Sequence, residues 1–229
     1  MKILDVEQGS VPWYEARLGI ATASSFDKII TPKTRKLSAQ AKGYAFFLIA
    51  EKLLNRSLDT LEGQEWMERG KELEPDAVKM YEFEQQVKTK PVGFITTDDG
   101  QLGASPDRLL VGVNGGLELK CPAPQTHVKY LLDGFGDDYF VQVQGQMYVG
   151  ELDFVDRYSY HPEMPPHRER IVRDESFIAD LASALRAFND MKAEMYERIK
   201  AQGFFAEREK LLTPVEAELG EYGNVIMAG

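Results

Sequence analysis

The chain is poor in cysteine, with Cys121 the only one among 229 residues. One thiol cannot form an internal disulfide, a four-cysteine zinc site or a cysteine-ligated iron–sulfur cluster within one chain. Long apolar runs are also missing, since no stretch of about 18 apolar residues exists for a membrane span. The first residues, MKILDVEQGS, lack the charged-then-apolar pattern of a secretory signal. We therefore expect a cytoplasmic protein that does not enter a membrane.

An excess of positive charge is absent too, because the formal net charge is −10. Such a chain does not coat nucleic acid by bulk electrostatic attraction. A polyanionic partner would need a local basic surface, for which the segment KTRK supplies Lys33 and Arg35, and Arg69 with Lys71 supplies a second pair. Short charge runs are more often solvated surface than binding sites.

Internal repeats, long Gly/Ser linkers, G-x-G-x-x-G and P-loop motifs are all missing. We therefore expect one domain over residues 1–229, in which 202–229 form an acidic C-terminal tail. The period of apolar residues predicts helices first, then a meander of strands, then a helix, strands and a long final helix. This order predicts an α/β fold with a mixed central β-sheet flanked by helices, rather than a doubly wound nucleotide-binding fold.

Individual elements follow from the same patterns. Helices are expected over 38–54, 64–86 and 176–200, and in the segments THVKYLLDG and DYFVQVQGQMYVG. Strands are expected in PVGFITT, QLGASPDRLLVGV, LELKC, FVDRYSYH and RERIVR.

The pair Asn114-Gly115 predicts a hairpin with a two-residue turn between two of these strands. Side chains alternate across a strand, so Glu118 and Lys120 share one face. With that turn, Val111 faces Glu118, and Asp107 lies on the same face about 13 Å from Val111 at 3.3 Å per residue. The strand would have to bend to bring Asp107 to Glu118.

The residue types of this hairpin suit one kind of chemistry. Two carboxylates beside a backbone carbonyl form an oxygen-rich site that favours Mg²⁺ over zinc. Lys120 cannot bind a cation, but it could hold and help to deprotonate a water that attacks phosphorus. The pattern therefore predicts phosphodiester hydrolysis. Taken alone, Glu-x-Lys is more often a surface salt bridge on a half-exposed strand.

The wider pattern is more specific. The segment SPDRLLVGVNGGLELKCP resembles the Asp…Glu-x-Lys core of restriction-endonuclease-like nucleases, and in particular that of the phage lambda exonuclease (viral recombinase) family. Three more motifs of this family occur in the same order over residues 7–200. They are W-x-x-x-R-L-G-x-x-T-A-S from Trp13, G-x-x-x-E-x-x-A from Gly70, and Q-V-Q from Gln142 with Tyr148 after it.

The resemblance implies a restriction-endonuclease-like core and a role for individual residues. Asp107, Glu118 and the Leu119 carbonyl would bind Mg²⁺, with Mn²⁺ as a substitute. Glu74 would complete a second metal position or contact it through water, and Lys120 would position the nucleophilic water. A pocket for a terminal 5′-phosphate would consist of the donors Arg17, Ser24, Ser105 and Gln142. Met67 would be the apolar wedge that opens the duplex, and either Lys33 or Arg35 would contact DNA.

The family's activity follows as an expectation. Its members digest linear double-stranded DNA from a 5′-phosphorylated end, 5′ to 3′, and leave a 3′ single strand. They form ring-shaped homotrimers threaded by DNA and work with a single-strand annealing protein in phage recombination.

Three other functions remain open at this point. One is a sequence-specific restriction endonuclease, and another is a RecB-like single-strand nuclease, whose iron–sulfur branch the lone cysteine disfavours. A third is a non-catalytic DNA-end-binding protein, against which the intact Asp107, Glu118 and Lys120 argue.

Overall fold

The computed structural model describes residues 1–58 and 64–203, and for 64–69 and 71 it describes the backbone without the side chains. The chain divides into two compact units, Met1–Asn189 and Asp190–Gly229. All elements belong to the first unit except the C-terminal turns of the last helix. Most of the predicted tail, 204–229, lies outside the described residues.

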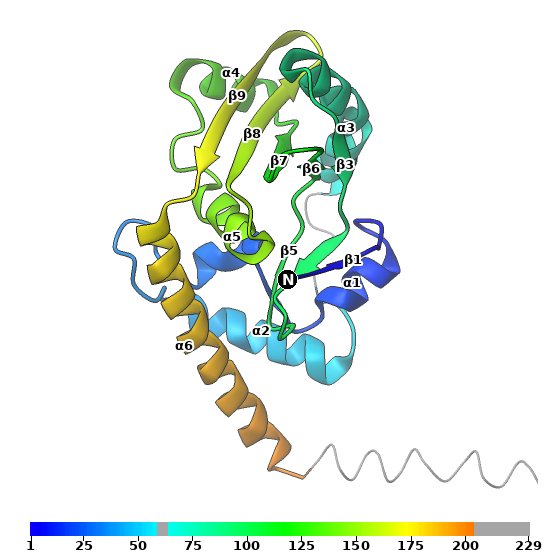
Figure 1. Cartoon of the computed structure of the whole chain (residues 1–229). Helices are drawn as coiled ribbons and strands as arrows, with labels where there is room; N and C mark the ends of the chain where they lie inside the picture. Colours follow the sequence, from blue (N-terminus) through cyan, green and yellow to red (C-terminus); the bar gives the residue numbers. More distant parts are fainter. Residues whose placement is uncertain (59–63, 204–229) are drawn as a thin grey trace, which may run out of the picture. The chain divides into compact units, whose positions relative to one another are not determined.

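Figure 1 shows the helices and strands of the chain. The helices are α1 (Val11–Arg17), the 3₁₀ helix η1 (Ala23–Lys28), α2 (Ala41–Leu54), α3 (Gln64–Gln85), α4 (Pro124–Asp133), α5 (Phe140–Gly150) and α6 (Glu175–Lys200). The strands are β1 (Lys2–Leu4), β2 (Ala21–Thr22), β3 (Thr89–Pro91), β4 (Phe94–Thr96), β5 (Leu102–Ala104), β6 (Arg108–Leu110), β7 (Gly115–Lys120), β8 (Phe154–His161) and β9 (Met164–Val172).

The predicted helices are all confirmed, and each predicted strand segment contains a strand. The sequence patterns missed β1 and β2, and of β3 they included only Pro91. β1 is fully exposed, and β2 is two residues long, so neither shows the alternation of apolar and polar residues that identifies a half-buried strand.

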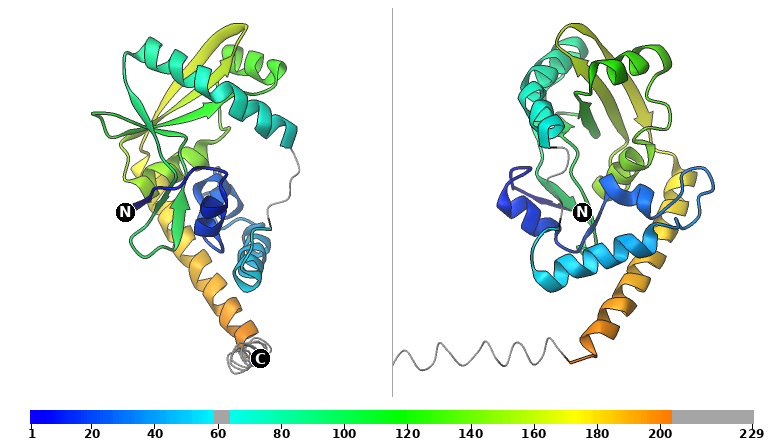
Figure 2. Two further views of the ribbon diagram at one scale, coloured as in Figure 1. Left: turned by 90° about the vertical axis from the view of Figure 1, so that its right-hand side faces the viewer. Right: turned by 180° about the vertical axis from the view of Figure 1, so that it is seen from behind.

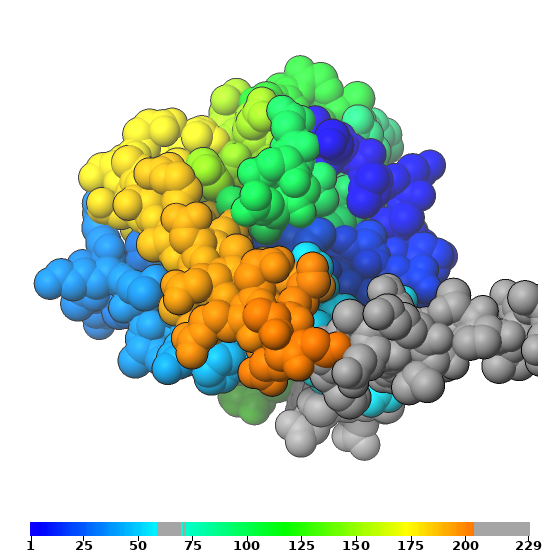
Figure 3. All heavy atoms as spheres, turned by 90° about the horizontal axis from the view of Figure 1, so that it is seen from below, coloured from blue at the N-terminus to red at the C-terminus, as the bar shows by residue number. Residues whose placement is uncertain are grey.

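The strands form two mixed sheets. A four-stranded sheet has the order β1-β4-β5-β2, in which only the β2–β5 pair is parallel. Figure 3 shows the N-terminal residues in dark blue beside the green residues of the β4–β5 hairpin. A five-stranded sheet has the order β3-β6-β7-β8-β9, in which only β7 and β8 are parallel. The prediction of a mixed sheet within an α/β fold is confirmed.

Helices cover both faces of the five-stranded sheet, with α3 and α4 on opposite sides of it (Figure 2). The alternation of side chains along β8 explains this arrangement. Asp156 accepts a hydrogen bond from Tyr81 on α3, whereas Ser159 contacts His127 on α4. Leu117 and Leu119 of β7 pack on the α3 side, so Glu118 points to the other face.

Helix α5 contacts both sheets and is buried along most of its length (Figure 1). It approaches η1 closely at Gly145, where an added Cβ would lie 2.6 Å from the Phe26 ring. A glycine is therefore required at this crossing. The close approach holds the polar residues of α5 against β7, at the centre of the unit.

The β6–β7 hairpin does not have the predicted register. Arg108 pairs with Leu117 and Leu109 with Gly116, so the connection is four residues long rather than two. Asn114 does not form the tight turn, because its side chain donates to the Glu151 carbonyl at the end of α5. Gly115 serves packing instead, since a Cβ there would lie 2.4 Å from the Phe154 ring.

This shift changes where Asp107 lies. Because Arg108 pairs with Leu117 in an antiparallel ladder, the next position places Asp107 opposite Glu118. The predicted separation of about 13 Å along the strand does not arise. The ladder ends at Arg108, and the chain bends at Asp107 and through 111–114, where Gly112 has a φ of 84°.

No helix in the described part of the chain is long and apolar enough to cross a membrane.

Candidate active site

The three residues of the predicted catalytic core converge on one face of the five-stranded sheet. Asp107 accepts a hydrogen bond at Oδ2 from the backbone N–H of Leu119, at 2.6 Å. The Lys120 ammonium donates to Glu118 Oε1 and forms an ion pair with it. Glu118 is only 3% exposed, so this pair is shielded from water on the carboxylate side. Two acids and one amine are thus held together by adjacent strands.

The charges in this cluster do not balance. Desolvation, followed by the Glu118 carboxylate, raises the pKa of Asp107 well above its usual range. Burial alone would lower the pKa of Lys120, but the charges of Glu118 and Asp107 outweigh burial and raise it. Lys120 is therefore a charged donor, and it is one cation against two carboxylates. A strongly perturbed acid next to a like charge is typical of a functional site.

Two amides from α5 complete the surroundings of Glu118. Gln142 Nε2 donates to Oε1 and Gln146 Nε2 donates to Oε2, each at 2.6 Å. The predicted phosphate-pocket residue Gln142 thus contacts Glu118, and its phosphate role stays a prediction. Gln146 was missed, although its spacing of four residues from Gln142 places both on one helix face.

Tyr139 is a further residue that sequence reasoning missed. It immediately precedes α5 in the left-handed region, with φ of 61°, and its ring centroid lies 4.5 Å from Lys120 Nζ. The ring face attracts the ammonium through a cation–π contact. Nothing in the sequence pattern connects Tyr139 to Lys120, because the contact depends on how the start of α5 packs against the sheet.

The donor set fits a hard divalent cation. Asp107 and Glu118 supply carboxylate oxygens, and the repulsion between them would be relieved by a cation. Gln146 Oε1 is buried and has no hydrogen-bond partner among the described residues, and it belongs to the amide that holds Glu118. No three His, Cys, Asp or Glu side chains of the described residues lie close enough to hold a metal by themselves. The predicted ligand set adds the Leu119 carbonyl to the two carboxylates.

The helix α3 carries two more predicted residues. Glu74 is half-buried, and its charge contributes to the raised pKa of Asp107. Glu74 does not form a three-carboxylate group with Asp107 and Glu118, so its predicted metal role remains a prediction. The side chain of Met67, the predicted wedge, lies outside the described residues.

A second polar group forms around Arg17. Its guanidinium donates to Ser105 Oγ at 3.3 Å and to Thr22 Oγ1 at 3.4 Å. Ser24 joins through Thr22, at 3.2 Å between the hydroxyl oxygens. The guanidinium also lies 4.0 Å from the centroid of the Trp13 ring, which holds its plane. Three of the four predicted phosphate ligands are thus brought together, and Ser105 lies two residues before Asp107.

The two candidates for a further DNA contact differ in their surroundings. Arg35 donates to Ser176 Oγ at 2.8 Å and forms ion pairs with Asp174 and Asp180. Its charge is therefore neutralised at the start of α6, which argues against a DNA contact. Lys33 is exposed in the same segment, so it is the better candidate.

Comparison with known proteins agrees with this geometry. Residues 12–153 match the model of the YqaJ-like viral recombinase domain. An alkaline exonuclease from Laribacter hongkongensis is 30% identical, with 85% of this chain and 98% of that chain covered and a TM-score of 0.75. The same enzyme has been solved in complex with dAMP, with the same similarity.

A phage-related exonuclease from Haemophilus somnus 129PT shares the fold, with a TM-score of 0.62 at 17% identity, over 79% of this chain and 96% of that chain. A comparison with curated proteins gave no match. The match over residues 12–153 covers more than half of the chain and includes Arg17, Asp107, Glu118 and Lys120. The chain therefore belongs to the YqaJ-like viral recombinase family.

Proposed function

We propose that the chain is a Mg²⁺-dependent exodeoxyribonuclease that digests linear double-stranded DNA 5′ to 3′ from 5′-phosphorylated ends. The 3′ single strand that it leaves would serve single-strand annealing recombination. The observation that carries this proposal is the position of Asp107 opposite Glu118, with Lys120 bound to Glu118 and Arg17 bound to Ser105 nearby. Family membership and the exonuclease relatives support it.

In this proposal the reaction is hydrolysis of the first phosphodiester bond of the 5′-ended strand. Water adds to phosphorus, the bond from phosphorus to the 3′ oxygen of the terminal nucleotide breaks, and that oxygen takes up a proton. The products are a nucleoside 5′-monophosphate and a strand with a new 5′-phosphate. The complex of the Laribacter exonuclease with dAMP agrees with a product of this class.

Asp107, Glu118 and the Leu119 carbonyl would hold Mg²⁺ (or Mn²⁺), with Glu74 contributing through water, since no three acidic side chains of the described residues lie close enough to bind one ion together. Bound there, the cation would neutralise charge on the scissile phosphate and favour deprotonation of the attacking water. Lys120 stays charged next to Glu118, so it would act as a donor that orients this water and stabilises the developing negative charge. Gln142 and Gln146 hold Glu118 in place.

The Arg17 group would bind the terminal phosphate. A guanidinium with the hydroxyl groups of Ser24 and Ser105 around it can donate several hydrogen bonds to phosphate oxygens. One residue, Pro106, separates Ser105 from Asp107, so the proposed phosphate and metal sites are adjacent along the chain. Met67 as wedge and Lys33 as DNA contact complete the proposed interface.

The test is incubation of linear duplex, labelled at either end of one strand, with Mg²⁺. We expect loss of the 5′-ended strand, faster with a 5′-phosphate than with a 5′-hydroxyl, and no cutting of closed circular DNA. Arg17→Ala should erase the advantage of the 5′-phosphate. Cleavage of closed circles at fixed sites would instead identify a restriction endonuclease, and end binding without hydrolysis would identify a binding protein.

Assembly is a separate part of the proposal. The ring-shaped homotrimer and the single-strand annealing partner are supported by family membership alone. A positive inner channel would reconcile a net charge of −10 with DNA binding. Light scattering of the purified protein should give three times the mass of the chain, and a monomer at all concentrations would contradict the ring.

A further inference from the structure

The chain passes directly from one sheet to the other at two places. Residues 92–93, the first crossover, lead from β3 of the five-stranded sheet to β4 of the four-stranded sheet. Residues 105–107, the second crossover, lead back from β5 to β6. The strands on either side pair, β3 with β6 and β4 with β5, so the two crossovers run alongside each other. The second one carries Ser105 and Asp107, one residue from each proposed binding site.

A side chain from the N-terminal segment ties the two crossovers together. Gln8 Nε2 donates to the Val92 carbonyl at 2.8 Å and to the Pro106 carbonyl at 2.9 Å. A primary amide has two N–H groups, so each of them serves one crossover. Val92 and Pro106 are both buried, and a buried carbonyl that loses its donor is costly. The two bonds from Gln8 therefore hold the two carbonyls at a fixed separation.

The segment that carries Gln8 packs closely on the first crossover. An added Cβ at Gly93 would lie 2.0 Å from the Val6 carbonyl, so this glycine lets the two backbones meet. Trp13 makes a second tie, since its Nε1 donates to the Gly93 carbonyl at 3.2 Å and to Ser105 Oγ at 3.1 Å. Two side chains of one short segment thus bridge the same pair of crossovers.

The place at which Gln8 holds the second crossover bears directly on Asp107. The β6–β7 ladder ends at Arg108, so Asp107 lies just beyond the paired strands. The Pro106 carbonyl belongs to the same peptide group as the backbone nitrogen of Asp107. Because a peptide group is planar, holding its oxygen also restrains the Cα of the next residue. Gln8 is thus joined to the acid through one rigid peptide group.

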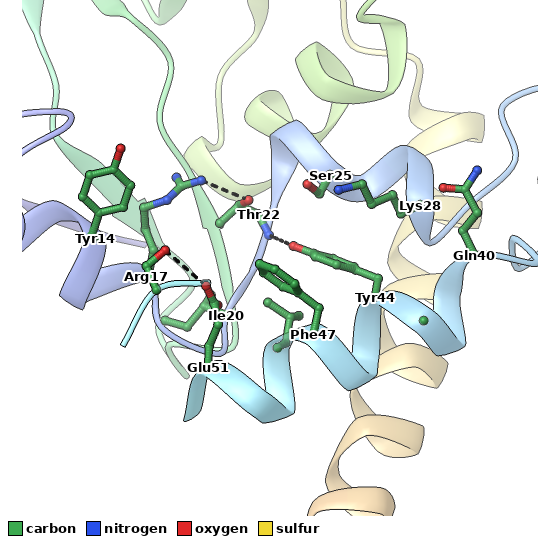
Figure 4. A pocket seen from close by; sticks show the side chains of 13 residues that line it. Tyr14, Arg17, Ile20, Thr22, Ser25, Lys28, Gln40, Tyr44, Phe47 and Glu51 are labelled. Atoms are coloured by element: carbon green, nitrogen blue, oxygen red, sulfur yellow. Dashed lines mark hydrogen bonds between the residues drawn. The ribbon is translucent and has the colours of Figure 1, made fainter. Parts of the chain in front are cut away.

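The other end of the second crossover is held differently. Ser105 accepts from Arg17, whose second guanidinium nitrogen donates to Thr22 (Figure 4). The bonds from Arg17 and Trp13 therefore hold Ser105, whereas the bond from Gln8 holds the peptide group next to the acid. Loss of the Gln8 amide should disturb Asp107 more than the Arg17 group.

We propose that Gln8 is a positioning residue for the metal site. By tying the two crossovers, it holds Asp107 where its carboxylate can share a cation with Glu118. The inference rests on the proposed function, in which these two acids bind Mg²⁺. If Gln8 served packing alone, its substitution would lower stability without changing the affinity for Mg²⁺. A positioning role predicts that this affinity falls while the reaction itself persists once Mg²⁺ is saturating.

The first measurement needs neither metal nor DNA. Gln8→Met keeps an unbranched side chain without N–H groups, and Gln8→Asn keeps the amide but is one methylene too short to reach both carbonyls. Hydrogen exchange of the metal-free full chain over residues 102–110 should be fastest in Gln8→Met and intermediate in Gln8→Asn. Gln144→Met is the matched control, because Gln144 also donates to a backbone carbonyl, that of Val172 at 2.9 Å, outside both crossovers. Thermal unfolding of each variant checks the fold.

The second measurement is binding of Mg²⁺ without DNA, by calorimetry. We expect the Kd for Mg²⁺ to be about 10-fold higher in Gln8→Met than in wild type, at the lower end of what removal of a supporting contact causes. Saturating Mg²⁺ should return the maximal rate of hydrolysis to within a few-fold of wild type. Gln144→Met should bind Mg²⁺ as wild type does.

The outcomes separate this inference from the proposed function. Suppose that Asp107→Asn abolishes Mg²⁺ binding but Gln8→Met leaves the exchange over 102–110 or the Kd for Mg²⁺ unchanged. The positioning role of Gln8 would then be overturned, and the proposed function would stand. If Asp107→Asn bound Mg²⁺ as tightly as wild type, the metal role of Asp107 would fall, and the proposed mechanism with it. Should Gln8→Met not fold, the same comparisons made with Gln8→Asn decide.

Discussion

Two acidic groups on opposite faces of the same sheet have opposite electrostatic surroundings. On the α3 face, Asp156 is fully buried, accepts a 2.6 Å hydrogen bond from Tyr81, and forms ion pairs with Arg168 and Arg170. Burial alone would raise the pKa of Asp156, but the hydrogen bonds from Arg170 and Tyr81 hold it below its usual range. On the other face, the pKa of Asp107 is raised.

The difference lies in the number of neutralising partners. Asp156 has two guanidinium groups for one carboxylate, whereas Asp107 and Glu118 share the single ammonium of Lys120. A fully neutralised acid holds strands and helices together. An acid whose charge is left uncompensated costs stability and is poised to bind a cation. The comparison therefore indicates a structural role for Asp156 and agrees with the proposed metal-binding role of Asp107.

The largest expected effect is on catalysis. Asp107→Asn and, separately, Lys120→Ala should each lower the rate of DNA hydrolysis by about 10³-fold or more, because in the proposed mechanism Asp107 holds the metal and Lys120 orients the attacking water. Mg²⁺-dependent binding of DNA ends should persist in Lys120→Ala. Single-turnover hydrolysis and end-binding assays measure the two effects. Activity equal to wild type in Lys120→Ala would remove this residue from the mechanism.

The matched substitution at the structural acid should affect stability instead. Asp156→Asn weakens charge-assisted hydrogen bonds to Arg168 and Arg170, and we expect it to lower the free energy of unfolding by about 3 kcal/mol. Hydrolysis well below the unfolding temperature should stay within a few-fold of wild type. Chemical denaturation and activity measured on the same sample test this. If Asp156→Asn abolished activity without destabilising the fold, the structural role of Asp156 would be contradicted.

A smaller effect is expected from substituting Gln146, whose side-chain amide donates to Glu118. Gln146→Leu removes a buried donor to Glu118 Oε2, and loss of such a supporting contact typically weakens metal affinity about 10- to 100-fold. The Mg²⁺ concentration for half-maximal rate should rise accordingly. Gln144→Leu is the control, since this amide on the same helix contacts Val172 and Asp174 instead. An equal Mg²⁺ requirement in the two variants would contradict the role of Gln146.

The smallest expected effect is in the pH dependence of stability. The raised pKa of Asp107 disfavours its charged form in the fold, so at neutral pH without Mg²⁺ Asp107→Asn should be at least as stable as wild type. The two should converge as the pH falls through the raised pKa and Asp107 takes up a proton. Because the pKa of Asp156 is lowered in the fold, its carboxylate stabilises the protein fully at pH values above about 3.8, its ordinary pKa. This stabilisation is lost as the pH falls below that value.

Thermal unfolding from pH 7 to pH 3, with and without Mg²⁺, measures both groups. Saturating Mg²⁺ at pH 7 should raise the unfolding temperature of wild type more than that of Asp107→Asn, because a ligand stabilises the state that binds it. If the difference in stability between wild type and Asp107→Asn did not change with pH, the charged form of Asp107 would not be destabilising in the fold.

Much of the fold could be predicted from local patterns. The apolar stripe of the last helix identified α6, and the Asp…Glu-x-Lys spacing identified the three residues that converge. Side-chain alternation alone placed Glu118 and Lys120 on one face, and this is confirmed by their ion pair. These features depend only on the geometry of one helix or one strand, so a single segment contains the information.

Other features required the folded chain. The Asn114-Gly115 pair has the local preference for a tight turn, but Asn114 donates to Glu151 and Gly115 packs against Phe154. The strands pair in a different register, which brings Asp107 opposite Glu118. Gln142 has the chemistry of a phosphate ligand, yet α5 directs it to Glu118. The sequence left Lys33 and Arg35 open as DNA contacts, and only the fold shows that Arg35 forms ion pairs with Asp174 and Asp180.

The sequence by itself therefore determined which chemical groups this protein has and on which face of its own strand or helix each one lies, because backbone geometry repeats with a known period. Only the tertiary structure decided which of those groups meet. Partners such as Gln146 and Tyr139 are far from Glu118 and Lys120 along the chain, and long-range packing, not local preference, brings them into contact.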